Sequence, residues 1–188
     1  MERPPGDRVK QTISSLKKRF DGGKVIQVQT EEGHVYNATC TFNPPATDAE
    51  IAQFESETGY ILPKDYKEFL KITNGCSLFD DVEYGGEVDL YSLEEIIEYN
   101  QGYDEYEGCY DIAYIYQDNI VIHSTCISQN EGNYLFWKGH IDQFDEARPL
   151  ESNFELWVDR FVVCQGAKFW WWPIYTSANE DKLKRKGL

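Results

Sequence analysis

The segment from Thr47 to Gly75 constrains the fold most, because it reads as two short helices joined by a tight turn. Thr47 and Glu50 have the spacing of a capping box, in which a hydroxyl and a carboxylate satisfy backbone N–H groups at a helix start. Gly59 can adopt the left-handed conformation that ends a helix, and Pro63 suits the first position of the next one. We therefore predict a helical hairpin that stops at Gly75.

Strand and helix patterns continue on both sides of this hairpin. Predicted strands cover 24–30 and 34–42 as a β-hairpin, part of 82–91, and then 112–116, 120–127 and 133–137. Predicted helices cover 92–100, with Leu93, Ile96 and Ile97 facing inward, and a final segment capped by Asn153 and ended near Gly166. The chain of 188 residues suits one domain. We predict an α+β fold: a mostly antiparallel or mixed sheet with an N-terminal helical hairpin and a C-terminal helix packed on it.

The two ends of the chain carry apolar and basic residues together. Val9, Ile13, Leu16 and Phe20 form one stripe on a basic amphipathic helix. This stripe is expected to pack on the domain's own core, although such helices also bind membranes or partners. Near the other end, residues 169–175 hold three consecutive tryptophans, which no single strand or helix can turn inward together. We expect at least one of these rings to be half exposed, and it either packs on the body or contacts a partner.

The hairpin residues and two later segments resemble one protein family. Leu62-Pro63, Tyr66, Phe69-Leu70 and Asn74-Gly75 are similar to the signature of the SUKH superfamily, the yeast glucan-synthesis-regulator-like family. Residues 90–96 look like the second landmark of that family, and residues 154–161 resemble its closing helix. The resemblance divides the chain into an N-terminal helix and β-hairpin extension (1–42), a SUKH-like domain (43–166) and a Trp-rich, basic tail (167–188).

This resemblance implies a single α+β domain that acts without a catalytic residue set. In bacteria, such domains most often act as immunity proteins that bind and neutralise a cognate toxin, commonly a nuclease or another enzyme. The fungal relatives act as regulatory hubs of the cell wall. The resemblance therefore implies a protein partner in either case.

Charge is distributed very unevenly along the chain, whose net charge is −15. Residues 1–24 carry +4, residues 25–164 carry −22 and residues 165–188 carry +3. No Lys or Arg lies between Lys71 and Lys138, whereas that interval holds fourteen Asp and Glu, twelve of them from Asp80 to Asp111. Such a surface repels nucleic acid and attracts basic proteins, because nucleic-acid affinity depends on Lys and Arg. The same charge also fits a solvated face that favours solubility.

The residue types of metal and catalytic sites do not form recognisable patterns here. The five cysteines are widely spaced without a C-x-x-C pair, which argues against a secreted disulfide scaffold and for a reducing cytoplasm. His123 and Cys126 have the spacing of half a zinc site, and no second close pair accompanies them. No nucleophile, nucleotide or metalloprotease motif is present. We expect no enzyme activity, no cofactor or metal, and no membrane-spanning segment.

We therefore predict a cytoplasmic bacterial immunity protein that occludes the basic active-site cleft of a toxin, with a nuclease as the expected toxin. The predicted contact residues are Asp80, Asp81, Glu83, Tyr84, Asp104, Glu105, Tyr106, Glu107 and Asp111. Their carboxylates supply steering and charge-assisted hydrogen bonds, and their tyrosines supply buried area. The alternatives are a regulatory interaction protein linked to cell-wall synthesis, and an enzyme or sugar-binding module that uses the tryptophans for stacking.

Overall fold

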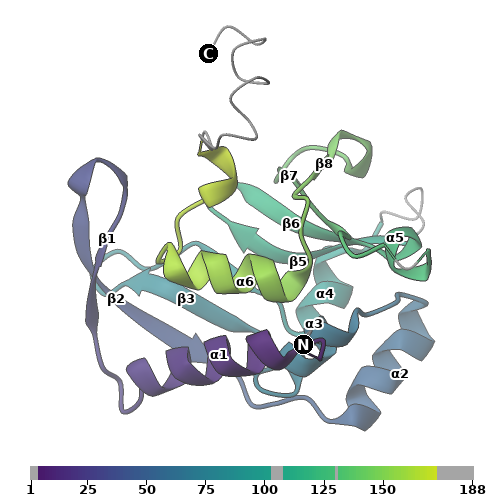
Figure 1. Cartoon of the computed structure of the whole chain (residues 1–188), viewed down its shortest axis with the longest axis horizontal. Helices are drawn as coiled ribbons and strands as arrows, with labels where there is room; N and C mark the ends of the chain where they lie inside the picture. Colours follow the sequence, from purple (N-terminus) through teal and green to yellow (C-terminus); the bar gives the residue numbers. More distant parts are fainter. Residues whose placement is uncertain (1–3, 103–107, 130, 173–188) are drawn as a thin grey trace, which may run out of the picture.

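A computed structural model of the chain describes residues 4–102, 108–129 and 131–172, which form one antiparallel sheet and its helical cover (Figure 1). The strands are β1 (Ile26–Gln29), β2 (Val35–Phe42), β3 (Cys76–Asp81), β4 (Val88–Leu90), β5 (Cys109–Ile115), β6 (Asp118–His123), β7 (Leu135–Gly139) and β8 (Arg148–Pro149). The α-helices are α1 (Asp7–Arg19), α2 (Asp48–Thr58), α3 (Lys64–Leu70), α4 (Leu93–Tyr99), α5 (Ser124–Ser128) and α6 (Phe154–Val163). Three short 3₁₀-helices complete the described part: η1 (Glu31–Gly33), η2 (Phe144–Glu146) and η3 (Phe169–Trp171).

The order of the strands in the sheet is the order of the strands in the chain. Each strand from β1 to β8 pairs with the next in antiparallel orientation. The sheet, the helical hairpin and the C-terminal helix confirm the predicted α+β fold class. β2 pairs with β3, so the described part of segment 1–42 belongs to the same sheet as the segment that follows.

Helices α1 and α6 run side by side across one face of the sheet (Figure 1). The apolar stripe of α1 is buried in the core, as expected from its spacing. Asp159 of α6 fixes the two helices to each other, since it accepts hydrogen bonds from Arg8 Nη1 at 3.2 Å and from Thr12 Oγ1 at 2.6 Å. The first and last helices of the described chain therefore share one layer over the core.

The helical hairpin has the predicted caps, with two differences in its second half. Thr47 and Glu50 form both halves of the capping box, and Gly59 ends α2 with φ +73°. Pro63 lies at the N-cap of α3, one position before the predicted one. Helix α3 ends at Leu70, before the predicted stop, and Asn74 contacts the next helix: its Oδ1 accepts a hydrogen bond from the N–H of Leu93 at 3.0 Å.

Strand β3 does not appear among the predicted elements, because its burial does not alternate. Leu78 and Phe79 are adjacent and both buried, which is possible because Phe79 adopts φ +57° and breaks the two-residue period. Ile97, predicted to face inward, is 38% exposed. Residues 124–127, predicted as strand, form α5, whose first turn is capped by His123 Nδ1 accepting from the N–H of Thr125.

The tryptophan cluster is partly packed and partly exposed, as predicted. Trp170 lies against Trp157 of α6, with ring centroids 6.1 Å apart. The indole N–H groups of Trp170 and Trp171 both donate to Asp118 Oδ2, at 3.3 and 2.9 Å. Trp171 is nevertheless 57% exposed. The cluster therefore closes one end of the core and leaves a ring face open to water.

Gly75 gives a direct test of the packing between β3 and α4. Its φ is +84°, and a Cβ at this position would lie 2.6 Å from the backbone nitrogen of Ser92. We expect Gly75→Ala to lower the free energy of unfolding by at least about 2 kcal/mol, measured by urea unfolding. Gly85→Ala is the matched control, because Gly85 has φ +81° with no atom near its Cβ position. Equal losses in both variants would show that backbone strain alone, and not the close approach, determines the effect.

Candidate functional site: an acidic, tyrosine-lined pocket

The sheet carries polar side chains on the face opposite its apolar, helix-covered face. Across four neighbouring strands, Asp89 of β4 pairs with Tyr114 of β5, Tyr114 pairs with Asn119 of β6, and Asn119 pairs with Lys138 of β7. Directly paired residues project from the same face of a sheet. A polar row therefore crosses the middle of the sheet.

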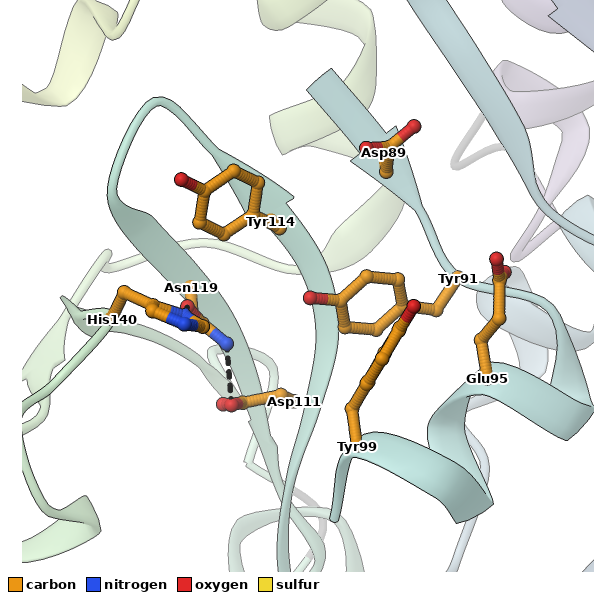
Figure 2. A pocket seen from close by; sticks show the side chains of 8 residues that line it. All are labelled: Asp89, Tyr91, Glu95, Tyr99, Asp111, Tyr114, Asn119 and His140. Carbon is orange, nitrogen blue, oxygen red and sulfur yellow. Dashed lines mark hydrogen bonds between the residues drawn. The ribbon is translucent and has the colours of Figure 1, made fainter. Parts of the chain in front are cut away.

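Asp89, Tyr114 and Asn119 of this row form the floor of a cavity of about 330 Å³ (Figure 2). Its lining residues are Asp89, Tyr91, Glu95, Tyr99, Asp111, Tyr114, Asn119 and His140. The strands supply the floor, helix α4 supplies Glu95 and Tyr99 along one side, and His140 follows the end of β7. Within the described ranges, no Lys or Arg lines the pocket, whereas three carboxylates do.

A β-bulge brings Asp111 and Tyr114 to the same face of β5. Residues three apart on a regular strand project from opposite faces, but the register of β5 against β6 shifts between Asp111 and Ala113. Ile112 in the bulge is fully buried. The extra residue thus lets one strand supply both a carboxylate and a phenol to the pocket.

Helix α4 is held beside the pocket at both of its ends. At its start, Glu95 Oε2 accepts from the N–H of Ser92 at 2.7 Å and Ser92 Oγ accepts from the N–H of Glu95 at 3.2 Å. After its end, Asn100 Oδ1 accepts from the N–H of Asp111 at 2.7 Å, and its Nδ2 donates to the carbonyl of Asp111 at 3.0 Å. Glu95 and Tyr99 are therefore fixed relative to β5.

Asp111 and Lys138 form a buried ion pair beneath the pocket. Their side chains are 4% and 1% exposed, and Lys138 Nζ lies 3.4 Å from Asp111 Oδ2. Asn119 Nδ2 donates to the same oxygen at 2.5 Å. Burial raises the pKa of the Asp111 carboxyl, and Lys138 and Asn119 oppose that rise. The other oxygen, Oδ1, is buried and has no hydrogen-bond partner among the described residues.

The tautomer of neutral His140 follows from this hydrogen-bond chain. Because Asn119 Nδ2 donates to Asp111, Asn119 Oδ1 must face His140 Nδ1, from which it lies 2.9 Å away. Nδ1 therefore carries the proton and donates, which leaves Nε2 as the acceptor of the neutral ring. The ring of Tyr114 stands edge-on to His140, with centroids 5.1 Å apart and an interplanar angle of 81°.

Tyr91 and Tyr99 form the aromatic side of the pocket. Their ring centroids lie 4.8 Å apart, at 52° to each other. Tyr91 is buried, whereas Tyr99 is 49% exposed and lies at the mouth. Burial, followed by neighbouring acidic groups, raises the pKa of both phenols, so both remain protonated and neutral at physiological pH. The pocket therefore combines neutral aromatic rings with carboxylates.

The predicted contact residues that the structure describes differ in their surroundings. Asp80 lies at the end of β3, partly buried, where burial and then Asp89 raise the pKa of its carboxyl. Asp81 accepts from the N–H of Glu83 at 2.8 Å, in a turn where Tyr84 is 87% exposed. Asp104, Glu105, Tyr106 and Glu107 lie outside the described residues. Asp80 thus lies close enough to the pocket residue Asp89 for the two carboxylates to repel each other.

Asp111 differs from its predicted role. It was expected on an exposed loop, but it lies in β5 and its side chain is almost fully buried by Lys138 and Asn119. It therefore contributes charge to the pocket wall and not contact area on the outer surface. Sequence reasoning missed the other residues that line the pocket: Asp89, Tyr91, Glu95, Tyr99, Tyr114, Asn119 and His140. The alternation of Val88 and Leu90 was the available signal, because it predicts that Asp89 and Tyr91 project from the opposite face of the strand.

Two checks on the described residues concern metals and membranes. In residues 4–102, 108–129 and 131–172, no group of three His, Cys, Asp or Glu side chains is arranged to hold a metal ion. Over the same ranges, none of the helices has the length and apolar character needed to span a bilayer.

Known proteins are similar to this chain over half or more of its length. It is 40% identical over 134 residues to the uncharacterized protein YnaB of Bacillus subtilis (strain 168), covering 71% of this chain and 88% of that relative. It is 31% identical over 180 residues to the uncharacterized protein YobM of the same organism, covering 91% and 95%. It is also 34% identical over 104 residues to KNR4/SMI1 homolog 1 of Debaryomyces hansenii, covering 50% of this chain and 22% of the yeast protein.

The family model described as SMI1 / KNR4 family (SUKH-1) matches residues 45–160. That range begins at the helical hairpin, includes every residue that lines the pocket, and ends within α6. This chain therefore belongs to the SMI1/KNR4 family (SUKH-1).

Proposed function

We propose that this chain is an immunity protein that binds a cognate toxin protein and neutralises it without catalysis of its own. The observation that supports this most is the acidic pocket on the face of the sheet opposite α1 and α6. Membership in a family whose bacterial domains most often act as immunity proteins gives independent support. The function needs binding and not turnover, which agrees with a site whose carboxylates are largely tied into hydrogen bonds.

The charge of this face indicates the kind of target. Asp80, Asp89 and Glu95 lie on or near it, and the 25–164 segment as a whole carries −22. Opposite charges on two proteins raise their association rate and disfavour wrong partners. We propose a toxin with a basic active-site cleft, most simply a nuclease, whose substrate is excluded when the acidic face docks there.

The proposed contact surface extends from the pocket to the turn after β3. It includes Asp80, Asp81, Glu83 and Tyr84, together with the acidic segment Asp104, Glu105, Tyr106 and Glu107. Exposed tyrosines such as Tyr84 supply contact area at low entropic cost, because they have few rotatable bonds. The carboxylates supply charge-assisted hydrogen bonds to Lys and Arg of the toxin.

The alternative function is a regulatory interaction protein linked to cell-wall synthesis. The match to the yeast KNR4/SMI1 homolog favours it, although that match spans 22% of the yeast protein. Purifying the tagged chain from its native host and identifying co-purified proteins by mass spectrometry separates the two. A toxin that co-purifies at low salt, and less at moderate salt, supports the immunity function. Recovery of cell-wall synthesis enzymes without a toxin contradicts it.

Charge reversal gives a kinetic test of the proposed surface. Changing Asp104, Glu105 and Glu107 to lysine is expected to slow association with the toxin by about tenfold or more at low salt, because long-range attraction is lost. The salt dependence of the association rate should flatten as well. Stopped-flow or surface-based kinetics at several salt concentrations measure both quantities.

A matched control carries the same change in net charge at a different place. Glu31, Glu57 and Asp145 are exposed acids that lie outside the proposed surface, and lysine at all three changes the total charge equally. This control should retain most of the wild-type association rate. If both triple variants slow association to the same extent, the total charge and not the acidic segment governs encounter.

A further inference from the structure

We infer that the acidic, tyrosine-lined pocket binds the guanidinium group of an arginine side chain from the partner protein. This inference rests on the proposed function and deepens it, because it names the group of the toxin that the pocket receives.

The size of the pocket suits one inserted side chain. Its volume of about 330 Å³ lies at the lower end of the range for small-molecule sites. Tyr99 lies half exposed at the mouth, while Asp111 is buried at the floor, so the pocket has depth and an entrance. Figure 2 shows the side chains of Tyr91, Tyr99, Tyr114 and Asp111 arranged around one space.

The negative charge of the pocket favours a cationic ligand. Asp89, Glu95 and Asp111 line it, and Lys138, which lies outside the lining, has its Nζ 3.4 Å from the Oδ2 oxygen of Asp111. The buried Oδ1 of the same carboxylate has no hydrogen-bond partner in the part of the chain that the structure describes. An unsatisfied buried oxygen costs free energy that a nearby cation or donor recovers. The unsatisfied oxygen therefore favours a bound cation or donor independently of the number of acidic residues in the pocket.

The aromatic side selects among cations. Tyr91 and Tyr99 are neutral rings in mutual contact, and Tyr114 stands on the far side of the pocket next to His140. Aromatic faces attract cations, and the planar guanidinium both stacks on such faces and is more weakly hydrated than an ammonium group. Its five N–H donors also point in several directions in one plane, which suits acceptors that surround the group. These features favour arginine over lysine.

The direct test measures binding of Nα-acetyl-L-arginine amide to the full chain by NMR of the tyrosine ring signals. The comparison probe is Nα-acetyl-L-citrulline amide, which has the same shape and a neutral ureido group. We expect the arginine probe to bind at least about tenfold more tightly, because the ureido group lacks the positive charge and has a carbonyl acceptor in place of an NH₂ donor. Equal binding of the two probes, or tighter binding of Nα-acetyl-L-lysine amide, would overturn the inference.

Two variants and two controls locate the binding. Asp89→Asn removes a pocket charge, and the amide oxygen of the new side chain can still accept the hydrogen bond from the Ser77 hydroxyl. Tyr99→Ala removes the aromatic ring at the mouth of the pocket, at a position in α4 where alanine is compatible with the helix. Each should weaken binding of the arginine probe at least about fivefold. Glu98→Gln, on the same helix but outside the pocket, and Asp145→Asn, an exposed acid outside the proposed contact surface, should leave it unchanged. Undiminished binding in both pocket variants contradicts the site.

The same variants separate this inference from the proposed function. If a toxin binds the wild type and the Asp89→Asn and Tyr99→Ala variants equally, the immunity function stands and the arginine pocket does not. If the arginine probe binds in the pocket but no toxin is recovered, the pocket stands and the immunity function does not. Loss of toxin binding in both pocket variants, with retention in Glu98→Gln, supports the two together.

Discussion

Replacing Lys138 by methionine is expected to destabilise the folded chain by about 3–5 kcal/mol at neutral pH, because it leaves a buried carboxylate without its cation. The affected pair is Lys138 and Asp111, 3.4 Å apart and almost fully buried. Methionine keeps most of the length and apolar character of the lysine stem, so the change removes charge and little volume. Chemical unfolding at pH 7 measures the loss.

The loss should depend on pH in a defined direction. In the variant, burial still raises the pKa of Asp111, but Lys138 no longer opposes the rise. Asn119 and His140 continue to oppose it. The folded state then binds the proton more tightly than the unfolded chain, so stability begins to fall above the unfolded pKa of about 3.9 and is lost as pH rises through the raised folded pKa. The deficit relative to wild type should be small near about pH 4 and full near neutrality.

The double variant Asp111→Asn/Lys138→Met is the matched control. With both charges removed, most of the loss at pH 7 should disappear, since an apolar or neutral pair often replaces a buried ion pair without cost. A deficit that is the same from pH 4 to pH 7, or that persists in the double variant, would show that packing and not charge causes it.

Replacing Asp65 by alanine is expected to lower the free energy of unfolding by roughly 4 kcal/mol, because three hydrogen-bond donors lose the carboxylate that accepts from them. Asp65 Oδ1 accepts from the hydroxyl of Tyr134 at 2.5 Å and from the N–H of Tyr66, and Oδ2 accepts from the N–H of Glu155 at 2.9 Å. The Tyr134 hydroxyl in turn accepts from the N–H of Phe154 at 3.0 Å. This network joins α3 to the start of α6, where a carboxylate also interacts favourably with the helix dipole.

Two comparison variants show whether the network acts as described. Tyr134→Phe removes only the hydroxyl and should cost about 1–2 kcal/mol. Asp48→Ala removes an acid whose side chain is 83% exposed and paired with Lys71, and should cost at most about 1 kcal/mol. Thermal and urea unfolding of all three rank the losses. An Asp65→Ala loss no larger than that of Asp48→Ala would contradict the buried network.

The features of this fold that were predictable are local in the sequence. The capping box of α2, the Asn153 cap of α6 and the apolar stripe of α1 each depend on residues three or four apart, so spacing alone reveals them. The hairpin of β1 and β2 was predictable for the same reason, because its turn and its alternation are adjacent.

The pocket was harder to predict because its residues come together through long-range pairing. His140 reaches Asp111 only because three antiparallel strands lie side by side, and Asp111 faces the pocket only because of a bulge that no residue type marks. Asn100 likewise holds two backbone groups of Asp111, eleven residues away. The acidic composition predicted the sign of the charge on this face, but the depth of the site and its aromatic side required the structure.

The pairing of the first and last helices has a consequence for synthesis on the ribosome. Arg8 and Asp159 are 151 positions apart, so α1 emerges long before its partner helix exists. The sheet can assemble strand by strand as the chain grows, since each strand pairs with its predecessor. The apolar stripe of α1, however, lacks α6 until nearly the whole described chain has been translated. Nascent chains arrested before α6 therefore expose that stripe and become targets for chaperones and proteases.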